Sequence, residues 1–476
     1  MTNPTRRTVL VSLAALPLAP ACTPAPDDDD SAFLGDDDDS ALANDDDSAV
    51  GDDDDSAVGD DDDSTDPPAD PYVVEGDLDA TSFPSALQVT DAAPDSVLVG
   101  LRTIEPDLRL HLGRIEGQQV FDAWTSDVLA APDGIFNAEI TALLPDTGYQ
   151  LYAVDPSGTR RSDIVIFRTA LAAGTSRAMS IAVTSCLGRT GAPWNSLRQT
   201  ASESPDVCLL LGDTVYADGA TSLDEYRGFW DEALGTDGIY YMSLAASFVA
   251  TWDDHEVDNN WSWDNEGDRV DEAIAAFRES FPQRSGPDPD RVYRTLPWGD
   301  AVELIVLDCR ADRLNGDYIS AEQMAWIKDT LSTSTARFKL ILNSVPIIDF
   351  TDWIGGISAD DRWQGNPTQR EELLGYIEDE GIQGVLFLGG DMHFGSVCRV
   401  SRDGEVGDSL YEVMAGPGGS VVNPMTLIVP TWTDQFELVV SDLNTVLLNL
   451  DPATGEVGVT FIDDNGDVID EKLLSL

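Results

Sequence analysis

Short apolar runs recur along the second half of the chain, each bounded by polar or turn-forming residues. Six of them are four or five residues long and rich in Val, Ile and Leu, namely 180–183, 207–211, 248–251, 303–307, 338–342 and 384–388. Continuous apolar runs of this length are typical of strands that are covered on both faces. With the helices predicted between them, they indicate an α/β fold with a layered α/β/α domain, which we assign to residues 175–476.

Two helix starts are marked by capping signals. Ser320 opens a capping box before the apolar stretch 324–327, and Thr368 opens another before 373–377. Gly381 suits the end of the second helix, because glycine adopts the left-handed conformation that is common there. Both predicted helices lie between predicted strands, as expected of helices that cover a sheet in a layered domain.

The preceding residues, 71–172, alternate apolar and polar positions and are broken by Pro, Gly and Asp turns. This period of two predicts a small all-β domain. Its second half, residues 144–169, resembles the last strands of a fibronectin type III sandwich, in which Tyr149 would be the corner tyrosine. We therefore expect an all-β sandwich ahead of the α/β domain.

The N-terminus has the pattern of an export signal. Arg6-Arg7 precedes an apolar stretch over 9–21, which is too short to span a membrane as a permanent helix. The arginine pair resembles a twin-arginine signal, and Ala19-Pro-Ala-Cys22 resembles a lipobox. We expect residues 1–22 to be a signal peptide and Cys22 to carry the lipid that anchors the protein at the cell envelope, in the periplasm or on the cell surface. The alternative is cleavage without lipidation and a secreted product.

Residues 23–70 are predicted to be a disordered, Asp-rich linker, since 27–66 contains 20 aspartates and no lysine or arginine. Without these aspartates the net charge falls only from −61 to −41. Such an acidic chain is a poor partner for nucleic acid, because phosphate backbones are bound through Lys and Arg. A phosphorylated substrate remains compatible, since bound cations invert the local field. We expect a monomer.

The five cysteines do not form a disulfide framework. Cys22 belongs to the export signal, and Cys208, Cys309 and Cys398 lie in or beside apolar runs, where we expect buried structural thiols. Cys186 differs from these, because it directly follows a predicted strand together with other polar residues.

Polar or reactive groups directly follow five of the predicted strands. They are Thr184-Ser-Cys186, Gly212-Asp213, Trp252-Asp-Asp-His255, Asn343 and Gly389-Gly-Asp-Met-His393. In open α/β sheets, groups just past the carboxyl ends of the strands converge in one crevice. Two of the three histidines in the chain, His255 and His393, lie in these stretches. The sequence therefore predicts one active site built from distant segments.

These motifs resemble those of the PhoD-like alkaline phosphatases, a branch of the calcineurin-like metallophosphoesterases. The matching stretches are Ser185-Cys186, Gly212-Asp-Thr-Val-Tyr216, Trp252-Asp-Asp-His-Glu256 with Asn259-Asn260, Asp308-Cys-Arg-Ala-Asp-Arg313 and Gly390-Asp-Met-His393. An N-terminal β domain also fits that family. The sequence departs from the family pattern at Thr214 and Ala217, where an aromatic residue and an acid are common, and at Asn343.

The residue types predict a dinuclear or multinuclear metal site. A single carboxylate, Asp213, is suited to bridge two cations about 3.5–4 Å apart. A thiolate and a phenolate, Cys186 and Tyr216, favour a trivalent ion, because a phenol with a pKa of about 10 ionises at neutral pH only beside a strongly acidic cation. The resemblance also implies that this ion is Fe³⁺ and that His393 is its remaining ligand. Cys186 and Tyr216 as packing residues remain the alternative.

At the second metal position, Asp254 and Asp391 offer hard oxygen ligands that suit Ca²⁺, Mg²⁺ or Mn²⁺, with Zn²⁺ also possible. Asn343 is either a further ligand or a structural residue. Fe³⁺ with Ca²⁺ is the combination we favour.

Three residues are candidates for catalysis. We expect His255 to act as general acid or transition-state donor, beside Asp254, and Arg310 to clamp the phosphate in a fork, perhaps together with Arg313. An arginine that only forms an ion pair is the alternative for Arg310. Asp253 and Glu256 are expected to support the site through hydrogen bonds.

The sequence thus predicts an exported metallophosphoesterase of the alkaline phosphatase or phosphodiesterase type. It would hydrolyse phosphate mono- or diesters, in small-molecule or polymer substrates, by attack of a metal-activated hydroxide. The alternative is a cell-surface lipoprotein that binds glycan or a protein partner and carries a degenerate phosphatase domain. Metal content separates the two.

Overall fold

A computed structural model describes residues 9–12, 72–117, 119–261, 263–313, 317–349, 362–427 and 434–476. The predicted linker over 23–70 and Cys22 lie outside these residues, as does the predicted signal peptide apart from β1 (Val9–Ser12), which pairs in parallel with β8. Within the described ranges, no helix combines the length and the apolar character needed to cross a membrane.

The first part of the described chain is all β, as predicted, and we call it the β region. Its strands are β2 (Asp77–Leu78), β3 (Gln88–Thr90), β4 (Ser96–Arg102), β5 (Asp107–Glu116), β6 (Gln119–Thr125), β7 (Leu129–Ala130), β8 (Ile135–Thr141), β9 (Gly148–Val154), β10 (Arg160–Arg161) and β11 (Val165–Arg168). Two sheets pack through alternating apolar residues such as Val99 and Leu110. The Tyr149 hydroxyl accepts a hydrogen bond from the backbone N–H of Leu144 at 2.9 Å, the contact expected of a corner tyrosine.

One sheet of the β region continues into the second half of the molecule. Its order is β1-β8-β4-β3-β14-β13-β12-β22-β23-β24. The strands from the second half are β12 (Met179–Thr184), β13 (Val207–Leu211), β14 (Ser247–Thr251), β22 (Thr445–Asp451), β23 (Glu456–Ile462) and β24 (Val468–Ser475). The junction is the parallel pair of β3 and β14, where Thr90 faces Phe248. The two halves are therefore joined by backbone pairing as well as by side chains.

A second sheet, in the order β15-β16-β17-β18-β20-β19-β21, packs against the first. Its strands are β15 (Arg294–Trp298), β16 (Val302–Val306), β17 (Phe338–Leu342), β18 (Val385–Gly389), β19 (Gly395–Arg399), β20 (Tyr411–Met414) and β21 (Phe436–Val440). Leu209 of β13 and Leu340 of β17 belong to the apolar cluster between the sheets.

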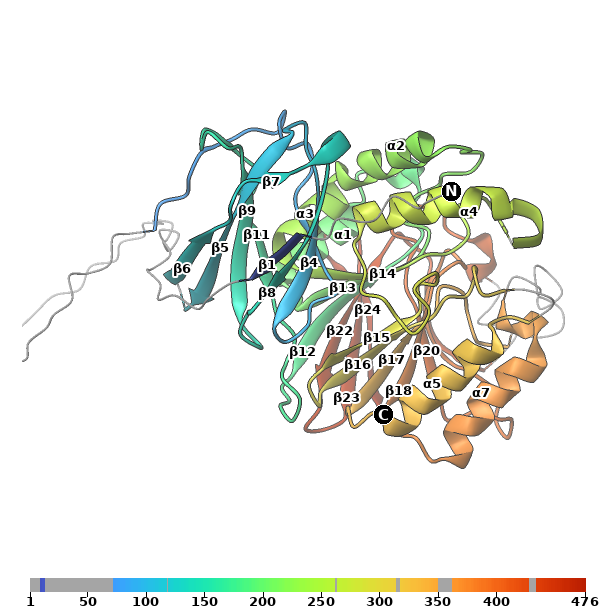
Figure 1. Ribbon diagram of the computed structural model, residues 1–476. Helices are drawn as coiled ribbons and strands as arrows, with labels where there is room; N and C mark the ends of the chain where they lie inside the picture. The colour runs from blue at the N-terminus through green and yellow to red at the C-terminus, as the bar shows by residue number, and fades with distance from the viewer. Residues whose placement is uncertain are drawn as a thin grey trace, which may run out of the picture.

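Helices cover the outer faces of both sheets (Figure 1). The first sheet is covered by α1 (Asn195–Thr200), α2 (Leu223–Leu234), α3 (Asp237–Ala245) and α4 (Trp263–Ser280), and the second by α5 (Ala321–Thr333) and α7 (Pro367–Asp379). The predicted layered α/β fold is confirmed. Its β layer consists of two sheets, because every predicted strand has one apolar face for a helix and one for the other sheet.

The predicted helix signals were correct in two of three places. Ser320 caps α5, and its Oγ accepts from the N–H of Gln323 at 3.0 Å. Gly381 follows α7 with a φ of +63°. Thr368 is not a cap, because Asn366 caps α7 and Pro367 occupies the first turn, where its missing N–H costs nothing.

A buried ion pair ties the β region to the second sheet. Arg294 of β15 donates from Nε and one terminal nitrogen to both carboxylate oxygens of Asp91, at 2.7 and 2.8 Å, and both residues are 2% exposed or less. Arg294 also donates to the carbonyl of Ala250 in β14 at 3.1 Å. This pair therefore fixes the relative position of three elements.

Asp91→Asn is expected to lower the free energy of unfolding by about 3–5 kcal/mol, because it leaves the Arg294 charge buried without compensation. Urea denaturation followed by circular dichroism measures the change. The matched control is Asp127→Asn, since Asp127 is exposed in the same β region and its variant should unfold like the wild type. Equal midpoints for the Asp91 variant and the control would contradict this role.

Candidate functional site

The carboxyl ends of parallel strands in the two sheets meet at one place. β12, β13 and β14 in the first sheet and β17 and β18 in the second are followed by the loops that carry the predicted motifs. Two groups of side chains gather there, Cys186 with Asp213 and His393, and Asp213 with Asp254 and His255. Within each group the ligand atoms lie within 4.8 Å of one another. Asp213 is shared by both groups.

The backbone at these positions is unusual for residues other than glycine. Cys186, Asp213, Asp391 and His393 have φ values of +54°, +54°, +65° and +57°. Non-glycine residues rarely adopt this region, at a cost of about 1–3 kcal/mol each, and such residues concentrate at functional sites. The strand ends thus turn sharply, so that side chains from both sheets face the same small space.

The hydroxyl of Tyr216 lies beside the first group, next to Asp213 and His393. The Tyr216 hydroxyl lies 3.3 Å from Oδ2 of Asp213 and 3.3 Å from Nε2 of His393. The other ring nitrogen of His393, Nδ1, lies 3.0 Å from the carbonyl oxygen of Val421, which can only accept a hydrogen bond. Nδ1 therefore carries the proton, and Nε2 is left to act as a ligand.

The first group has the chemistry of a cation site. Oδ1 of Asp213 is buried and has no hydrogen-bond partner among the described residues. Burial, followed by the charges of nearby carboxylates, raises the pKa of Asp213 and of the Cys186 thiol well above their usual range. A positive ion would remove both penalties, because it favours the ionised forms. The residues present therefore fit a bound metal.

Asp391 lies beside the first group. It follows β18 and is half-buried, and its charge contributes to the raised pKa of Cys186 and of Asp213, after burial and the charges of nearer groups. Its placement agrees with the prediction that it belongs to the site. It is not among the residues whose ligand atoms form the two compact groups.

In the second group, Asp254 and His255 are held by different partners. Burial alone would raise the pKa of Asp254, but the charges of Arg310 and His255 and the N–H of Asn260 lower it to about 2. Burial likewise lowers the pKa of His255, yet the hydrogen bond to Asp218 and the charge of Asp254 outweigh it and raise this pKa overall. The pair thus favours a carboxylate beside an imidazolium.

Asp218 is a site residue that the sequence analysis missed. Its two carboxylate oxygens lie 2.8 and 2.9 Å from Nδ1 of His255, and Oδ1 accepts from the N–H of Asn259 at 2.8 Å. An available signal was its position directly after Ala217, where the resembling family commonly has an acid. In the folded chain this neighbouring residue supplies the carboxylate.

Glu256 and Asp253 support the site, as predicted. The Glu256 carboxylate accepts from the N–H groups of Asp213, Thr214 and Asp253 at 3.1, 2.6 and 2.9 Å, and so fastens two motif loops together. Asp253 accepts from Arg310 and, at 2.8 Å, from the hydroxyl of Ser344. These contacts hold the loops in their strained turns.

The predicted role of Arg310 as a phosphate clamp does not agree with its position. Its guanidinium is fully buried and donates to both oxygens of Asp253, at 2.7 and 2.9 Å. It also lies 3.7 Å from Asp254. Sequence reasoning had left an ion pair as the alternative, and the structure favours it. Arg313, the possible second clamp, stacks its guanidinium over the ring of Tyr318.

Asn343 and the remaining cysteines have structural surroundings. Oδ1 of Asn343 accepts from Nε1 of Trp363 and from Sγ of Cys309, each at 3.0 Å, which favours the structural alternative for Asn343. Cys208, Cys309 and Cys398 are buried free thiols, as predicted.

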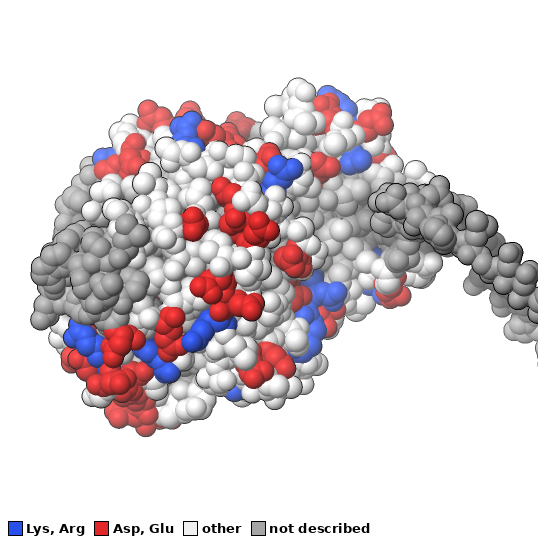
Figure 2. Space-filling view, turned by 180° about the vertical axis from the view of Figure 1, so that it is seen from behind, with Lys and Arg blue, Asp and Glu red and all other residues white. Residues whose placement is uncertain are grey.

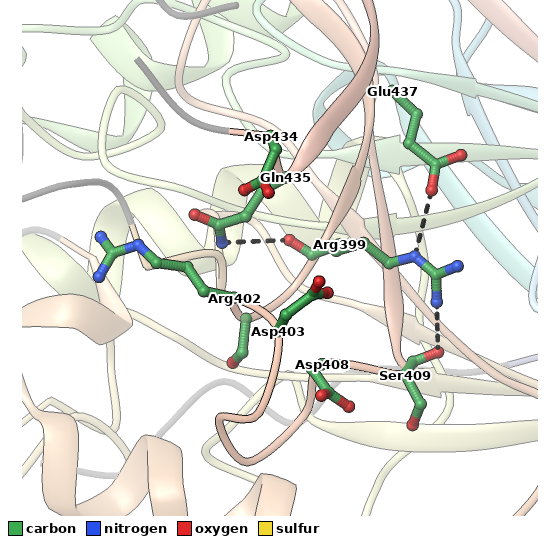
Figure 3. Close-up of a pocket in the computed structure, with 9 residues that line it drawn as sticks. Arg399, Arg402, Asp403, Asp408, Ser409, Asp434, Gln435 and Glu437 are labelled. Carbon is green, nitrogen blue, oxygen red and sulfur yellow. Dashed lines mark hydrogen bonds and ion pairs between the residues drawn. The ribbon is translucent and has the colours of Figure 1, made fainter.

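A surface pocket of about 490 Å³ lies apart from these groups (Figure 3). It is lined by residues of β19, β21 and the intervening turns: Arg399, Ser401, Arg402, Asp403, Asp408, Ser409, Asp434, Gln435 and Glu437. Arg399 is held by Glu437 at 3.1 Å and by the carbonyl of Ser409 at 3.3 Å. None of these lining residues, all of them described, belongs to either ligand group. The metal-ligand chemistry is therefore elsewhere.

Comparisons with known proteins identify the family of this chain. The family model described as PhoD-like phosphatase matches residues 181–428. Alkaline phosphatase D of Bacillus subtilis (strain 168) is 27% identical in an alignment 270 positions long, and the match covers 45% of this chain and 46% of that protein. The chain thus aligns with about half the length of this relative.

Two solved structures share the fold. The structure of PhoD has a TM-score of 0.70 at 19% identity and covers 83% of this chain and 89% of its own. The purple acid phosphatase PPD1 from yellow lupin (Lupinus luteus) seeds has a TM-score of 0.60 at 15% identity, over 83% of this chain and 75% of its own.

Asp218→Asn is expected to lower the pKa of His255, because the carboxylate that raises it is removed while burial remains. NMR titration of the metal-free protein measures this directly, since the chain has three histidines and few ring signals overlap. The charged form of His255 should then be lost at a lower pH than in the wild type. Asp258→Asn, which changes a carboxylate in the loop that carries His255, is the control. An unchanged His255 titration in the Asp218 variant would refute the pairing.

Proposed function

Because the chain belongs to the PhoD-like phosphatase family, we propose that it hydrolyses phosphate mono- or diesters at a centre of two or more metal ions. The observation that carries this proposal is the position of Asp213, which belongs to both groups of ligand atoms and whose buried Oδ1 has no hydrogen-bond partner among the described residues. The proposed ligands are Cys186, Asp213, Tyr216, Asp254, Asp391 and His393. Intact ligand groups favour an enzyme over a degenerate domain that only binds glycan or protein.

The proposed metals follow from the two kinds of donor. Sulfur, phenol and imidazole at Cys186, Tyr216 and His393 suit Fe³⁺, whereas carboxylate oxygens at Asp254 and Asp391 suit Ca²⁺ or another divalent ion such as Mn²⁺, Mg²⁺ or Zn²⁺. When bound, such a centre activates the attacking water and offsets the charge that develops on the phosphoryl oxygens.

The protein's own groups then position the reaction. Asp218 accepts the Nδ1 proton of His255 and orients the ring, so that Nε2 can present its proton to the leaving oxygen of the ester. In the metal-free protein the hydrogen bond to Asp218 and the charge of Asp254 raise the pKa of His255 against the effect of burial, which favours the protonated ring that a general acid needs. Arg310 is not a phosphate clamp in this scheme. It neutralises Asp253 and lowers the pKa of Asp254, which keeps that ligand ionised.

The cellular setting is also proposed. The arginine pair and Cys22 support export by the twin-arginine route and lipid anchoring at the cell envelope, with secretion as the alternative. Figure 2 shows acidic side chains over much of one face, with basic side chains in smaller groups. Such a surface disfavours nucleic acid as a partner, and its net charge favours a monomer. A phosphate-ester substrate would depend on the bound cations, which invert the local field.

Asp213→Asn is expected to lower the rate of nitrophenyl phosphate hydrolysis by more than about 100-fold, because loss of even an outer partner of a metal ligand costs 10–100-fold. The variant should keep the circular dichroism spectrum of the wild type. Asp127→Asn provides the matched control at an exposed site and should retain full activity. Near-wild-type hydrolysis by the Asp213 variant would refute the assignment.

Tyr216→Phe tests the iron proposal separately from activity. A phenolate bound to Fe³⁺ absorbs visible light, so the purified wild-type protein should be coloured and the variant should lose this band. Elemental analysis of both proteins shows whether the ion itself is retained. A colourless wild-type protein that contains stoichiometric metal would rule out the Tyr216–Fe³⁺ pair and leave the hydrolase proposal standing.

A further inference from the structure

The loop over residues 416–423, between β20 and β21, contacts the first ligand group, although it contains none of the sequence motifs described above. Its backbone N–H groups bind the loop that follows β12. Gly418 donates to the carbonyl of Ser185 at 2.9 Å, and Gly419 and Ser420 donate to the carbonyl of Cys186 at 3.1 and 2.9 Å. The peptide of a proposed metal ligand is therefore held directly by this loop.

The same loop also holds His393. Val421 accepts the Nδ1 proton of the His393 ring through its carbonyl oxygen, at 3.0 Å. Asn423 donates its backbone N–H to the carbonyl of His393 at 2.9 Å, and its side-chain amide to the carbonyl of Met392 at 3.0 Å. Both the ring and the peptide of His393 are thus fixed by residues of one loop.

Ser420 contacts Tyr216, the phenol beside this ligand group. Its hydroxyl donates to the hydroxyl oxygen of Tyr216, and its side chain is nearly fully buried. The other polar neighbours of this oxygen, Asp213 and His393, are themselves proposed ligands. Ser420 differs from them because it orients Tyr216 without being a ligand.

The loop packs tightly against neighbouring backbone and side chains, which restricts its movement as a unit. A Cβ atom on Gly419 would lie 2.4 Å from the ring of Trp194, and one on Gly191 would lie 2.3 Å from the carbonyl oxygen of Gly419. Asn444 exchanges hydrogen bonds with the backbone of Gly416, at 2.8 and 3.3 Å. The glycines therefore let two backbones approach closely, and the contacts to the ligands have a rigid support.

We infer that the 416–423 loop is the positioning element of the first metal position, and that Ser420 acts through the oxygen of Tyr216. This inference rests on the proposed metal-dependent function. Outer partners of this kind fix the orientation of a ligand and typically change metal affinity 10–100-fold when they are removed. Ser420 is a positioning residue in this scheme, since it acts through Tyr216 and is not one of the proposed ligands.

The test compares metal retention in four proteins: the wild type, Ser420→Ala, Tyr216→Phe and the double variant. Each purified protein is dialysed against increasing EDTA, and the remaining metal is measured by elemental analysis. Ser420→Ala should lose its first-site ion at an EDTA concentration about 10- to 100-fold lower than the wild type. In the Tyr216→Phe background the same substitution should have no further effect, because the group through which Ser420 acts is absent.

The visible band gives a second readout. Without the hydrogen bond from Ser420, the phenolate becomes a stronger electron donor, so the band of the Ser420 variant should move to longer wavelength. Ser243→Ala, which removes a buried hydroxyl from helix α3, is the matched control and should change neither property.

Three results would overturn the inference. In the first, the Ser420 variant keeps the metal retention and the band of the wild type. In the second, its effect adds fully to that of Tyr216→Phe, so that Ser420 acts by a route other than Tyr216. In the third, the wild-type protein binds no metal, and the proposed function fails together with this inference.

Discussion

The crowding of buried carboxylates at the strand ends is the constraint on which the site depends. Asp213, Asp253, Asp254 and Glu256 come together where water cannot screen them, and each is compensated differently. Glu256 is satisfied by three backbone N–H groups, and Asp253 by Arg310 and Ser344. One oxygen of Asp213 has no hydrogen-bond partner among the described residues. Protein groups thus compensate the carboxylates of Asp253 and Glu256, whereas the carboxylate of Asp213, which both ligand groups share, is available to bind cations.

Much of this arrangement could be predicted from the sequence, because strand ends are marked by abrupt changes from apolar to reactive residues. The strands β13 and β17 begin and end at the predicted residues. β14 begins one residue earlier than predicted, and β12, β16 and β18 differ by one residue at both ends. Gathering of the motif residues followed from the rule that parallel strands point their carboxyl ends the same way.

Other parts could not be predicted, since they depend on partners that meet only in space. Arg310 has the same sequence signal whether it faces a phosphate or Asp253, and only burial distinguishes the two. The 416–423 loop makes most of its contacts through backbone N–H groups and carbonyl oxygens, which carry no side-chain signal. The two side chains that it uses, Ser420 and Asn423, meet their partners only in the folded chain. The start of α7 was misplaced because two adjacent capping signals, at Asn366 and Thr368, compete locally.

The shared sheet bears on how the molecule can be divided. All five residues of β14 are buried, and β3 of the β region pairs with one edge of this strand at Phe248. A fragment that began at β12 would expose that edge as a flat apolar template, open to pairing with the same edge of another copy. Shortened versions of the phosphatase half are therefore better designed with the β region retained, because its strand β3 occupies this edge.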